Sequence, residues 1–296
     1  MTTTKTTVLI TGATSGIGRD AALYLHARGL RVIAAGRNEK ALGELREAGL
    51  EAVRLDVTDR ASIAAAQGEI ERLTGGHGVD VLVNNAGYGL FGPVEALADD
   101  DVRAQYETNV FGLLAVTRAF LPEMRARGRG KVLNVSSVGG RMTLPLGGVY
   151  NSTKYAVESL SDALRLEVKQ FGIDVVLIEP GYIKTNFTSH TVDLLEKYRD
   201  PSSPYAHLFE VTDGIEGKLE RFAAEPRAVS KAIERAIRAR RPAARYIAPR
   251  VNAIGLWLMQ LAPTRLVDWV MRRVSRLDRR PALPAPASRA ALPSGA

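Results

Sequence analysis

The sequence predicts an α/β fold, in which a doubly wound parallel sheet of about seven strands has helices on both faces and a helical appendage at its C-terminal end. Two observations support this class. Short apolar runs alternate with longer amphipathic helical patterns, and this alternation is typical of βαβ units. The first apolar run also leads through a glycine-rich turn straight into a helix, where open α/β sheets commonly bind ligands.

Each predicted strand is a short run rich in β-branched residues, followed by helical sequence. The strands are predicted at residues 7–10, 31–35, 51–55, 79–83, 131–135 and 173–178, and the helices between them at 21–28, 39–48, 59–73, 100–127 and 149–171. Glycine follows four of these helices, at positions 29, 49, 128 and 172, as expected where a left-handed residue ends a helix. A helix at 226–240 and a seventh strand at 245–248 complete the sheet.

The composition is that of an ordinary globular protein and removes several classes of function. Hydrophobic residues make up 46% and charged residues 24% of the 296 residues, which excludes a disordered, collagen-like or coiled-coil chain. The chain has no cysteine and four histidines. Disulfides, thiolate nucleophiles and sulfur-ligated metal sites are therefore excluded, and we expect no catalytic metal.

We predict one domain over residues 1–250, an appended helical segment over 251–280 and a disordered tail, rich in proline, alanine and serine, over 281–296. Residues 184–222 form a long insertion that we expect to act as a substrate lid. The N-terminal residues do not form a signal-peptide core. The apolar stretch at 251–264 is too short to span a bilayer, which takes about 20 residues, so we expect a cytoplasmic protein.

The positive charge is concentrated near the C-terminus. The net charge of the chain is +8, and residues 226–280 hold 14 lysines and arginines against three acidic residues. The preceding 225 residues hold 25 basic and 29 acidic residues. A nucleic-acid partner bound to a basic face of the main domain is therefore disfavoured.

The glycine-rich turn follows the first predicted strand. It reads TGATSGIGR at residues 11–19, with three glycines spaced Gly-x-x-x-Gly-x-Gly. Bare backbone there lets a pyrophosphate approach the positive N-terminal end of the helix, and the alternative is a tight strand-to-helix turn without a ligand. We favour a Rossmann-like dinucleotide site. Its predicted residues are Gly12, Thr14, Ser15, Gly16, Ile17 and Gly18.

The end of the second predicted strand indicates which dinucleotide is bound. It reads Ala35-Gly36-Arg37. A carboxylate at this position would bind the adenine ribose and repel a 2′-phosphate, whereas an arginine can bind that phosphate. We therefore expect NADP(H) rather than NAD(H), with Arg37 as the phosphate ligand and Arg19 as an added charge. The alternative for Arg37 is a solvated loop residue.

Polar residues also end the fourth and fifth predicted strands. These ends read NNAG at residues 84–87 and NVSS at residues 134–137, and the carboxyl edge of such a sheet faces the ligand crevice. Tyr150 and Lys154 follow four residues apart, which places them on one helical face. The combination of this pair with a glycine turn and a strand-end serine indicates a catalytic site.

The chemistry of the pair favours proton transfer. A tyrosine with an unperturbed pKa near 10 is a poor proton donor at neutral pH. A nearby ammonium and a cationic nicotinamide stabilise its phenolate, so we expect the pKa of Tyr150 to fall toward the working pH, with Ser137 donating a hydrogen bond to the developing alkoxide. A serine hydrolase is disfavoured because no histidine lies near these motifs and no Gly-x-Ser-x-Gly elbow exists.

Taken together, these motifs resemble the short-chain dehydrogenase/reductase family over residues 6–250. The match includes the glycine turn, the NNAG motif and a tetrad of Asn109, Ser137, Tyr150 and Lys154. The resemblance implies that Tyr150 passes a proton to or from the substrate oxygen and that Ser137 orients this oxygen. It also implies that Lys154 binds the nicotinamide ribose and that Asn109 holds a relaying water; the alternative for Asn109 is a helix-kink residue.

The resemblance implies further cofactor contacts. Asp56, followed by Val57, resembles the residue that contacts adenine; the alternative is an N-cap before the helix at Asp59. The PGYIKT sequence at residues 180–185 resembles the turn whose threonine holds the nicotinamide carboxamide. Outside the glycine turn, the implied cofactor-binding residues are Arg37, Asp56, Val57, Asn84, Ala86, Gly87, Tyr150, Lys154, Pro180, Gly181, Ile183 and Thr185.

Residues 150–159, 165–167 and 178–181 resemble the branch of the family that contains hydroxysteroid and retinol dehydrogenases, which favours bulky apolar alcohols and ketones. An apolar lid would suit such substrates. The alternative is that the apolar residues of the insertion pack it onto the domain. These residues are Phe187, Tyr205, Leu208 and Phe209.

The appended segment 251–280 combines an apolar stripe, interrupted at Pro263, with several arginines. Its two tryptophans, Trp257 and Trp269, together with the arginines suit an anionic membrane surface, so peripheral membrane association is one interpretation. The other is that the segment packs on the core or on a second subunit of a homo-oligomer.

The sequence thus predicts an NADP(H)-dependent oxidoreductase that interconverts an alcohol and a ketone or aldehyde on a lipophilic small molecule, steroid-, retinoid- or lipid-like. The alternative is a non-catalytic dinucleotide-binding regulatory or scaffold protein on the same fold. The absence of the tyrosine or the lysine would favour that alternative, and both residues are present.

Overall fold

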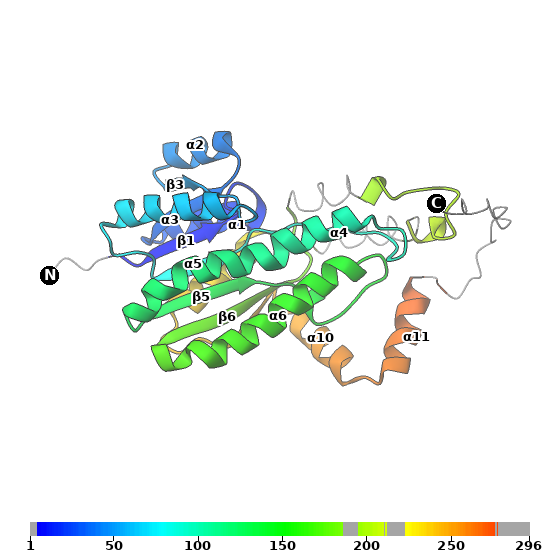
Figure 1. Cartoon of the computed structure of the whole chain (residues 1–296). Helices are drawn as coiled ribbons and strands as arrows, with labels where there is room; N and C mark the ends of the chain where they lie inside the picture. Colours follow the sequence, from blue (N-terminus) through cyan, green and yellow to red (C-terminus); the bar gives the residue numbers. More distant parts are fainter. Residues whose placement is uncertain (1–4, 186–194, 210, 212–222, 276, 278–296) are drawn as a thin grey trace, which may run out of the picture.

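The computed structural model describes residues 5–185, 195–209, 211, 223–275 and 277. At its centre lies a sheet that Figure 1 shows between the helices. The strands are parallel and have the order β3-β2-β1-β4-β5-β6-β7. The strands are β1 (Thr7–Thr11), β2 (Arg31–Gly36), β3 (Glu51–Arg54), β4 (Val81–Asn84), β5 (Gly130–Val135), β6 (Ile173–Pro180) and β7 (Arg245–Ala248). The predicted doubly wound parallel sheet is confirmed.

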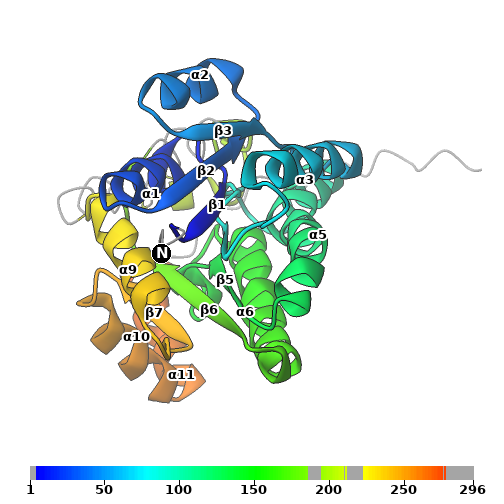
Figure 2. The same ribbon diagram turned by 90° about the vertical axis from the view of Figure 1, so that its left-hand side faces the viewer.

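Helices cover both faces of the sheet, which explains why its central strands are nearly continuous apolar runs. One apolar core joins the sheet to α1 (Gly16–Ala27), α2 (Glu39–Glu47) and α9 (Arg227–Arg238). The opposite core joins it to α3 (Arg60–Thr74), α5 (Leu113–Ala126) and the end of α6 (Gly148–Val168). Figure 2 shows α1 and α9 on one side of the sheet and α3, α5 and α6 on the other.

The predicted helix bounds need three adjustments. Helix α1 begins at Gly16, five residues before the predicted start, because the end of the glycine turn is its first helical turn. The helix predicted at 100–127 is interrupted: α4 (Asp99–Tyr106) leads through a π-helical turn, η1 (Glu107–Gly112), into α5. The helix predicted at 149–171 ends in a short 3₁₀ turn, η3 (Lys169–Phe171). The four glycines expected at helix ends all have positive φ, between 65° and 85°.

The appended segment forms two helices, α10 (Asn252–Leu261) and α11 (Thr264–Val274), separated at Pro263. It touches the domain at a few places. The Gln260 side chain accepts a hydrogen bond from Arg141, and Leu277 packs against a small apolar cluster beside the sheet. Trp257 and Trp269 remain 60% and 62% exposed. The segment is thus anchored to the core while much of its apolar surface faces outward.

The structure describes only part of the predicted lid and none of the predicted C-terminal tail. Of the apolar lid residues, Leu208 and Phe209 are buried and Tyr205 is partly buried in the cluster with Leu146, while Phe187 and the tail at 281–296 lie outside the described residues. Among the described helices, none is both long and apolar enough to cross a bilayer. The division at residues 250 and 280 stays a prediction.

Candidate active site

The candidate site lies at the carboxyl edge of the sheet. Strand β1 pairs with β2 on one side and with β4 on the other, so the chain reverses its direction of winding beside β1. A crevice outside the strand ends at such a reversal is the usual ligand site of an open α/β sheet. The glycine turn, the NNAG motif, Ser137 and the PGYIKT turn all follow strands that end at this edge.

The glycine turn is too tightly packed for side chains. A Cβ atom at Gly18 would lie 2.4 Å from the Gly12 carbonyl oxygen, and one at Gly12 would lie 2.8 Å from the Cα of Ala86. Gly12 and Gly16 also have φ values of +64° and +52°, which side-chain-bearing residues rarely adopt. The Ser15 side chain does not cap the first backbone N–H groups of α1. These features fit a pyrophosphate approaching bare backbone at a helix N-terminus.

Asn85 braces this turn, and the sequence-based site did not include it. Its Nδ2 donates to the carbonyl oxygens of Thr11 and Gly12, at 3.0 and 3.2 Å. In return, the Thr11 hydroxyl accepts from the backbone N–H groups of Asn85 and Ala86, at 3.0 and 3.1 Å. The NNAG motif therefore fixes the shape of the glycine turn from the neighbouring strand. The doubled asparagine was the signal in the sequence.

The other asparagine of this motif faces the interior. The Asn84 side chain is buried, and its Nδ2 donates to Thr117 Oγ1 and to Asn134 Oδ1, both at 2.9 Å. These partners lie on α5 and β5. The side chain of Asn84 is thus engaged within the fold and shapes the strand end, and the expected contact of Asn84 with the cofactor stays a prediction.

Arg37 lies at the end of β2 with its side chain 71% exposed and its Nη1 3.6 Å from Asp56 Oδ2. Burial raises the pKa of Asp56, but hydrogen bonds from the Thr58 N–H and hydroxyl and the charge of Arg37 hold it below its usual range. The cap of α3 is Asp59, not Asp56. Arg19 is paired with Glu44 at 2.9 Å, and its added charge at this end stays a prediction.

Ser137, Tyr150 and Lys154 come together above the end of β5. The Tyr150 side chain forms a hydrogen bond with Ser137, whose Oγ also accepts from the Gly139 N–H at 3.0 Å. Lys154 donates from Nζ to the Val135 carbonyl oxygen at 3.0 Å, and this Nζ lies 5.9 Å from the centroid of the Tyr150 ring. The structure therefore brings the three residues together as the sequence predicted.

Burial controls the pKa of both ionisable groups. It raises the pKa of Tyr150, and the hydrogen bond from Ser137 offsets this only in part. It lowers the pKa of Lys154 to about 8, while the negative charge of Glu158 acts in the opposite direction. In the chain by itself, the desolvation of the phenolate thus outweighs its stabilisation. The expected fall in the Tyr150 pKa includes the charge of a bound nicotinamide and stays a prediction.

Asn109 lies in the π-helical turn η1 and is buried. Its Oδ1 accepts from the Tyr88 N–H at 3.1 Å, and its Nδ2 donates to the Tyr88 carbonyl oxygen at 2.9 Å and to Thr153 Oγ1 at 3.1 Å. A Cβ atom at Gly87 would lie 3.0 Å from Asn109 Oδ1 and 3.8 Å from Lys154 Nζ. Asn109 thus lies beside the lysine and holds the backbone that follows NNAG.

The PGYIKT turn closes the site from β6. The Thr185 side chain lies beside Gly16, where a Cβ atom would be 3.4 Å from that of Thr185, and the Pro180 carbonyl accepts from Ser137 at 3.5 Å. Gly181 faces Asn252 of α10. The Ile183 side chain is buried in the core.

Other predicted contacts also have packing roles. Val57 is buried in the core next to Gly112, and Ile17 packs partly against the core. Thr14 lies against Gly36, at whose position a Cβ atom would come within 2.6 Å of its methyl group. For Val57, Ile17 and Ile183, the backbone is what remains to contact a cofactor, because their side chains pack against the protein.

Known proteins are similar to this chain in sequence and in fold. Residues 6–194 match the model of the short chain dehydrogenase family. The chain is 34% identical over 267 residues to the NADPH-dependent 3-dehydrocapnine reductase of Ornithobacterium rhinotracheale, covering 88% of this chain and 94% of that one. It is 40% identical over 282 residues to human retinol dehydrogenase 16, covering 90% and 88%. A solved short-chain dehydrogenase/reductase from Burkholderia phymatum, in complex with NAD, superimposes with a TM-score of 0.74 at 26% identity and covers 96% of this chain and 98% of that one.

Proposed function

From the premise that this chain belongs to the short-chain dehydrogenase/reductase family and is an oxidoreductase, we propose that it interconverts an alcohol and a ketone or aldehyde on a lipophilic small molecule with NADP(H). One observation carries this proposal. The hydroxyls of Ser137 and Tyr150 are hydrogen-bonded to each other, with the Lys154 amine near the tyrosine ring, at the sheet edge that carries the glycine turn.

The three side chains divide the proton chemistry between them. When bound, the nicotinamide cofactor supplies or accepts the hydride. Because its pKa is raised, Tyr150 is protonated at neutral pH and can donate a proton to the carbonyl oxygen during reduction. Ser137 holds this oxygen by a hydrogen bond, and the Lys154 ammonium stabilises the phenolate that remains. Positioned proton transfer of this kind contributes about 10²–10⁴ in rate.

The same edge offers residues that would hold the dinucleotide. The backbone of the glycine turn and the N-terminus of α1 would bind the pyrophosphate, and Lys154 and Thr185 would contact the nicotinamide end. NADP(H) is proposed over NAD(H) because the exposed guanidinium of Arg37 stands at the end of β2, and arginine binds a phosphate dianion well. The NADPH-dependent relative agrees with this choice, while the solved relative holds NAD.

The choice of cofactor is tested by Arg37→Ala. The variant should weaken NADPH binding by about 10-fold or more and leave NADH binding within about twofold, because only the 2′-phosphate loses a charged partner. Arg46→Ala is the matched control, since Arg46 lies on α2 and donates its hydrogen bonds to the Ala52 carbonyl oxygen on β3. It should leave the binding of both cofactors unchanged. Equal losses for both cofactors would contradict the phosphate contact.

An apolar wall beside Tyr150 supports a lipophilic substrate. Phe91 stacks on the Tyr150 ring with centroids 5.3 Å apart. Phe91 also packs against the buried cluster of Leu146, Leu208 and Phe209, so the insertion packs onto the domain behind the aromatic ring that contacts the tyrosine. Such surroundings suit a ligand with few polar groups.

The activity is tested by following NADPH oxidation across a panel of ketones and aldehydes of increasing apolar surface. Tyr150→Phe should lower kcat/KM by about 10²–10⁴ for every substrate turned over. Tyr155→Phe is the control, because Tyr155 lies on the same helix but is 44% exposed, and it should retain activity. Dinucleotide binding without turnover of any carbonyl would favour the non-catalytic alternative.

We further propose that the protein is cytoplasmic and that α10 and α11 attach it peripherally to an anionic lipid surface. The two helices expose apolar side chains, including Ile254, Leu261 and the two tryptophans, and arginines lie among them. Apolar side chains that enter the interface and cations that pair with lipid phosphates are the usual components of such binding. The arginines of this surface are Arg250, Arg265, Arg272 and Arg273.

Sedimentation with vesicles tests the attachment. The full chain should sediment with phosphatidylcholine vesicles that contain phosphatidylglycerol and much less with phosphatidylcholine alone. The double variant Trp257→Ser/Trp269→Ser should lose this binding, whereas Leu166→Ser should keep it, because Leu166 is 75% exposed but lies on α6. No sedimentation, with self-association that the double variant abolishes, would overturn the proposal and indicate a homo-oligomer interface.

A further inference from the structure

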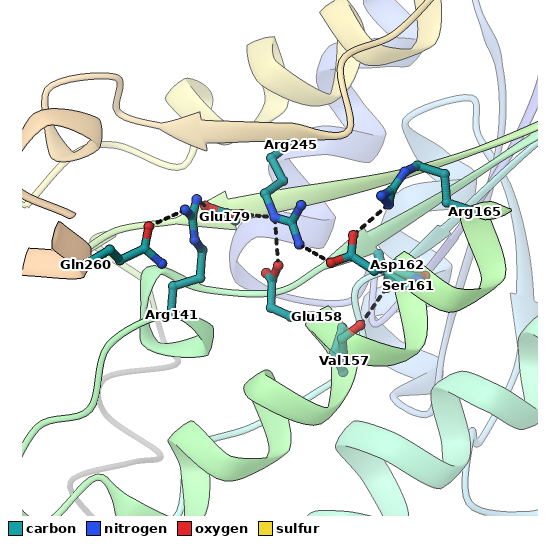
Figure 3. Close-up of polar contacts among 10 residues, drawn as sticks. Arg141, Val157, Glu158, Ser161, Asp162, Arg165, Glu179, Arg245 and Gln260 are labelled. Carbon is teal, nitrogen blue, oxygen red and sulfur yellow. Dashed lines mark hydrogen bonds and ion pairs between the residues drawn. The ribbon is translucent and has the colours of Figure 1, made fainter. Parts of the chain in front are cut away.

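Helix α6 carries a third ionisable residue, Glu158, one helical turn after Lys154. It is 6% exposed. Figure 3 shows its carboxylate pointing toward Arg245, whose Nε donates to Glu158 Oε2 at 3.0 Å. The Ser136 hydroxyl lies beside it: a Cβ atom at Gly140 would be 2.8 Å from Ser136 Oγ and 3.0 Å from Glu158 Cγ. A buried carboxylate therefore lies between the catalytic helix and the last strand of the sheet.

Arg245 joins this carboxylate to two others (Figure 3). Its Nη2 lies 2.6 Å from Asp162 Oδ2, and its Nε lies 3.1 Å from Oε1 of Glu179, whose side chain is fully buried. Arg141 approaches the other oxygen of Glu179 at 3.2 Å. Strands β6 and β7, helix α6 and the segment after the 3₁₀ turn η2 (Val138–Gly140) thus each contribute a charged group to one network.

The cations of the network oppose the effect of burial on Glu158. Burial raises the pKa of Glu158, and the charges of Arg245 and Arg141 offset this rise only in part. Two buried carboxylates without cations would not both stay charged, because each would repel the other in a poorly solvated site. Here the guanidinium group of Arg245 contacts both Glu158 and Glu179, and that of Arg141 contacts Glu179.

The negative charge of Glu158 acts on the Lys154 amine, which belongs to the preceding turn of the same helix. This amine is buried and bonded to a neutral carbonyl on β5, and it faces the neutral side chains of Tyr150 on its own helix and, across Gly87, Asn109 of η1. Among the described residues, Glu158 is the acidic group whose charge raises the pKa of Lys154 against the effect of burial. The other charged groups around Glu158 face it from β6, β7 and the segment after η2.

We propose that Glu158 is a positioning residue for the Lys154 amine: held by Arg245, its carboxylate keeps that amine in the ammonium form that the reaction uses. Its consequence for catalysis rests on the proposed function, whereas its effect on the amine does not. Removing the carboxylate should make the ammonium easier to deprotonate, because an opposite charge is lost from a poorly solvated site. Fewer enzyme molecules would then carry the charged lysine at pH 7–8.

The proposal is tested by lysine side-chain NMR on the full chain, with the Cε signal of Lys154 assigned by its loss in Lys154→Met. Glu158→Gln should lower the pKa of Lys154 by about one unit from its wild-type value. Asp162→Asn is the matched control, since Asp162 also binds Arg245 but lies one turn farther along α6, and it should change this pKa by less than about 0.3 units. An unchanged Lys154 pKa in Glu158→Gln overturns the proposal.

The coupling must be reciprocal, which provides a second test if Glu158→Gln does not fold. Linkage requires that loss of the Lys154 charge raise the pKa of Glu158 by the amount that loss of Glu158 lowers the pKa of Lys154. The Cδ signal of Glu158 in Lys154→Met should therefore titrate at higher pH than in the wild type. A Glu158 that titrates at the same pH in both proteins also overturns the proposal.

Kinetics separate this proposal from the proposed activity. With a carbonyl substrate found in the NADPH panel, the alkaline limb of kcat/KM should move to lower pH in Glu158→Gln by the same shift that NMR gives, while Glu158→Asp should restore it in large part. A merely structural role would lower activity equally at every pH. If no carbonyl is turned over, the proposed function fails, yet the NMR result still decides whether Glu158 holds the charge of Lys154.

Discussion

The brace that Asn85 gives to the glycine turn leads to a quantitative prediction. Asn85→Ala removes two hydrogen bonds, to the carbonyl oxygens of Thr11 and Gly12 at 3.0 and 3.2 Å. Each such bond contributes about 1 kcal/mol to stability, so the free energy of unfolding should fall by about 2 kcal/mol. The Gly12 peptide is then free to rotate away from the orientation that a pyrophosphate needs, and the lost preorganisation should weaken NADPH binding by about 10- to 30-fold.

Two assays measure the two effects. Urea unfolding gives the loss of stability, and fluorescence titration with NADPH gives the dissociation constant. Thr74→Ala is the control, because the Thr74 hydroxyl also bonds to backbone groups, the Ile70 carbonyl oxygen at 2.8 Å and the Gly78 N–H at 2.9 Å, but lies before β4, at the opposite edge of the sheet. It should lose similar stability and keep its affinity for NADPH. If Asn85→Ala also loses stability but binds NADPH like the wild type, the reasoning is refuted.

Three further predictions concern groups around the same sheet. Glu234 bonds to Tyr24 and to two arginines, and although burial raises its pKa, these partners lower it to about 2 from 4.5. Glu234→Gln should therefore lower the free energy of unfolding by about 2–3 kcal/mol at pH 7. In urea unfolding, this difference from the wild type should shrink as the pH falls from about 5 to 2, because the wild-type carboxylate takes up its proton in that range. A difference that stays constant down to pH 2 would speak against this ion-pair account. Lys131 donates to three carbonyl oxygens at the end of α9 at 2.6–3.2 Å, so Lys131→Met should lower the free energy of unfolding by about 2 kcal/mol with kcat unchanged; a variant as stable as the wild type would contradict it. Gly18→Ala should abolish NADPH binding and lower the melting temperature, since its Cβ would lie 2.4 Å from the Gly12 carbonyl oxygen. Normal NADPH binding in a titration would contradict this prediction and show that the turn can move to accept the methyl group.

The order of secondary structure could be predicted almost completely from the sequence. The central strands are runs of apolar residues buried on both faces, and glycines with positive φ end several of the helices between them. These are local properties, because the period of the apolar residues and the conformation of a glycine depend on a few neighbours. The predicted start of α1 was too late because it relied on local propensity, by which Gly16 and Gly18 are poor helix formers. In the structure both glycines belong to the first turn of α1.

The pairing of Tyr150 with Lys154 and Ser137 was also predictable, since a four-residue step on a helix and a strand-end serine are both properties of short segments. The electrostatics of that site were not. The sequence pointed to the charges that stabilise the phenolate of Tyr150, whereas the pKa also depends on how many atoms exclude water from the phenol, and burial raises it. Desolvation is a sum over the whole neighbourhood and has no signature in the sequence nearby.

The sequence by itself determined the sheet, the glycine turn and the catalytic helix, because each follows from residue types a few positions apart. Only the tertiary structure decided that Asn85, not Asn84, holds the glycine turn, since this depends on which neighbouring strand each amide faces. It also decided that Arg245, 87 residues beyond Glu158, supplies the cation for a carboxylate beside Lys154. Contacts between distant segments arise from strand order and burial, and these are set by the free energy of the packed chain as a whole.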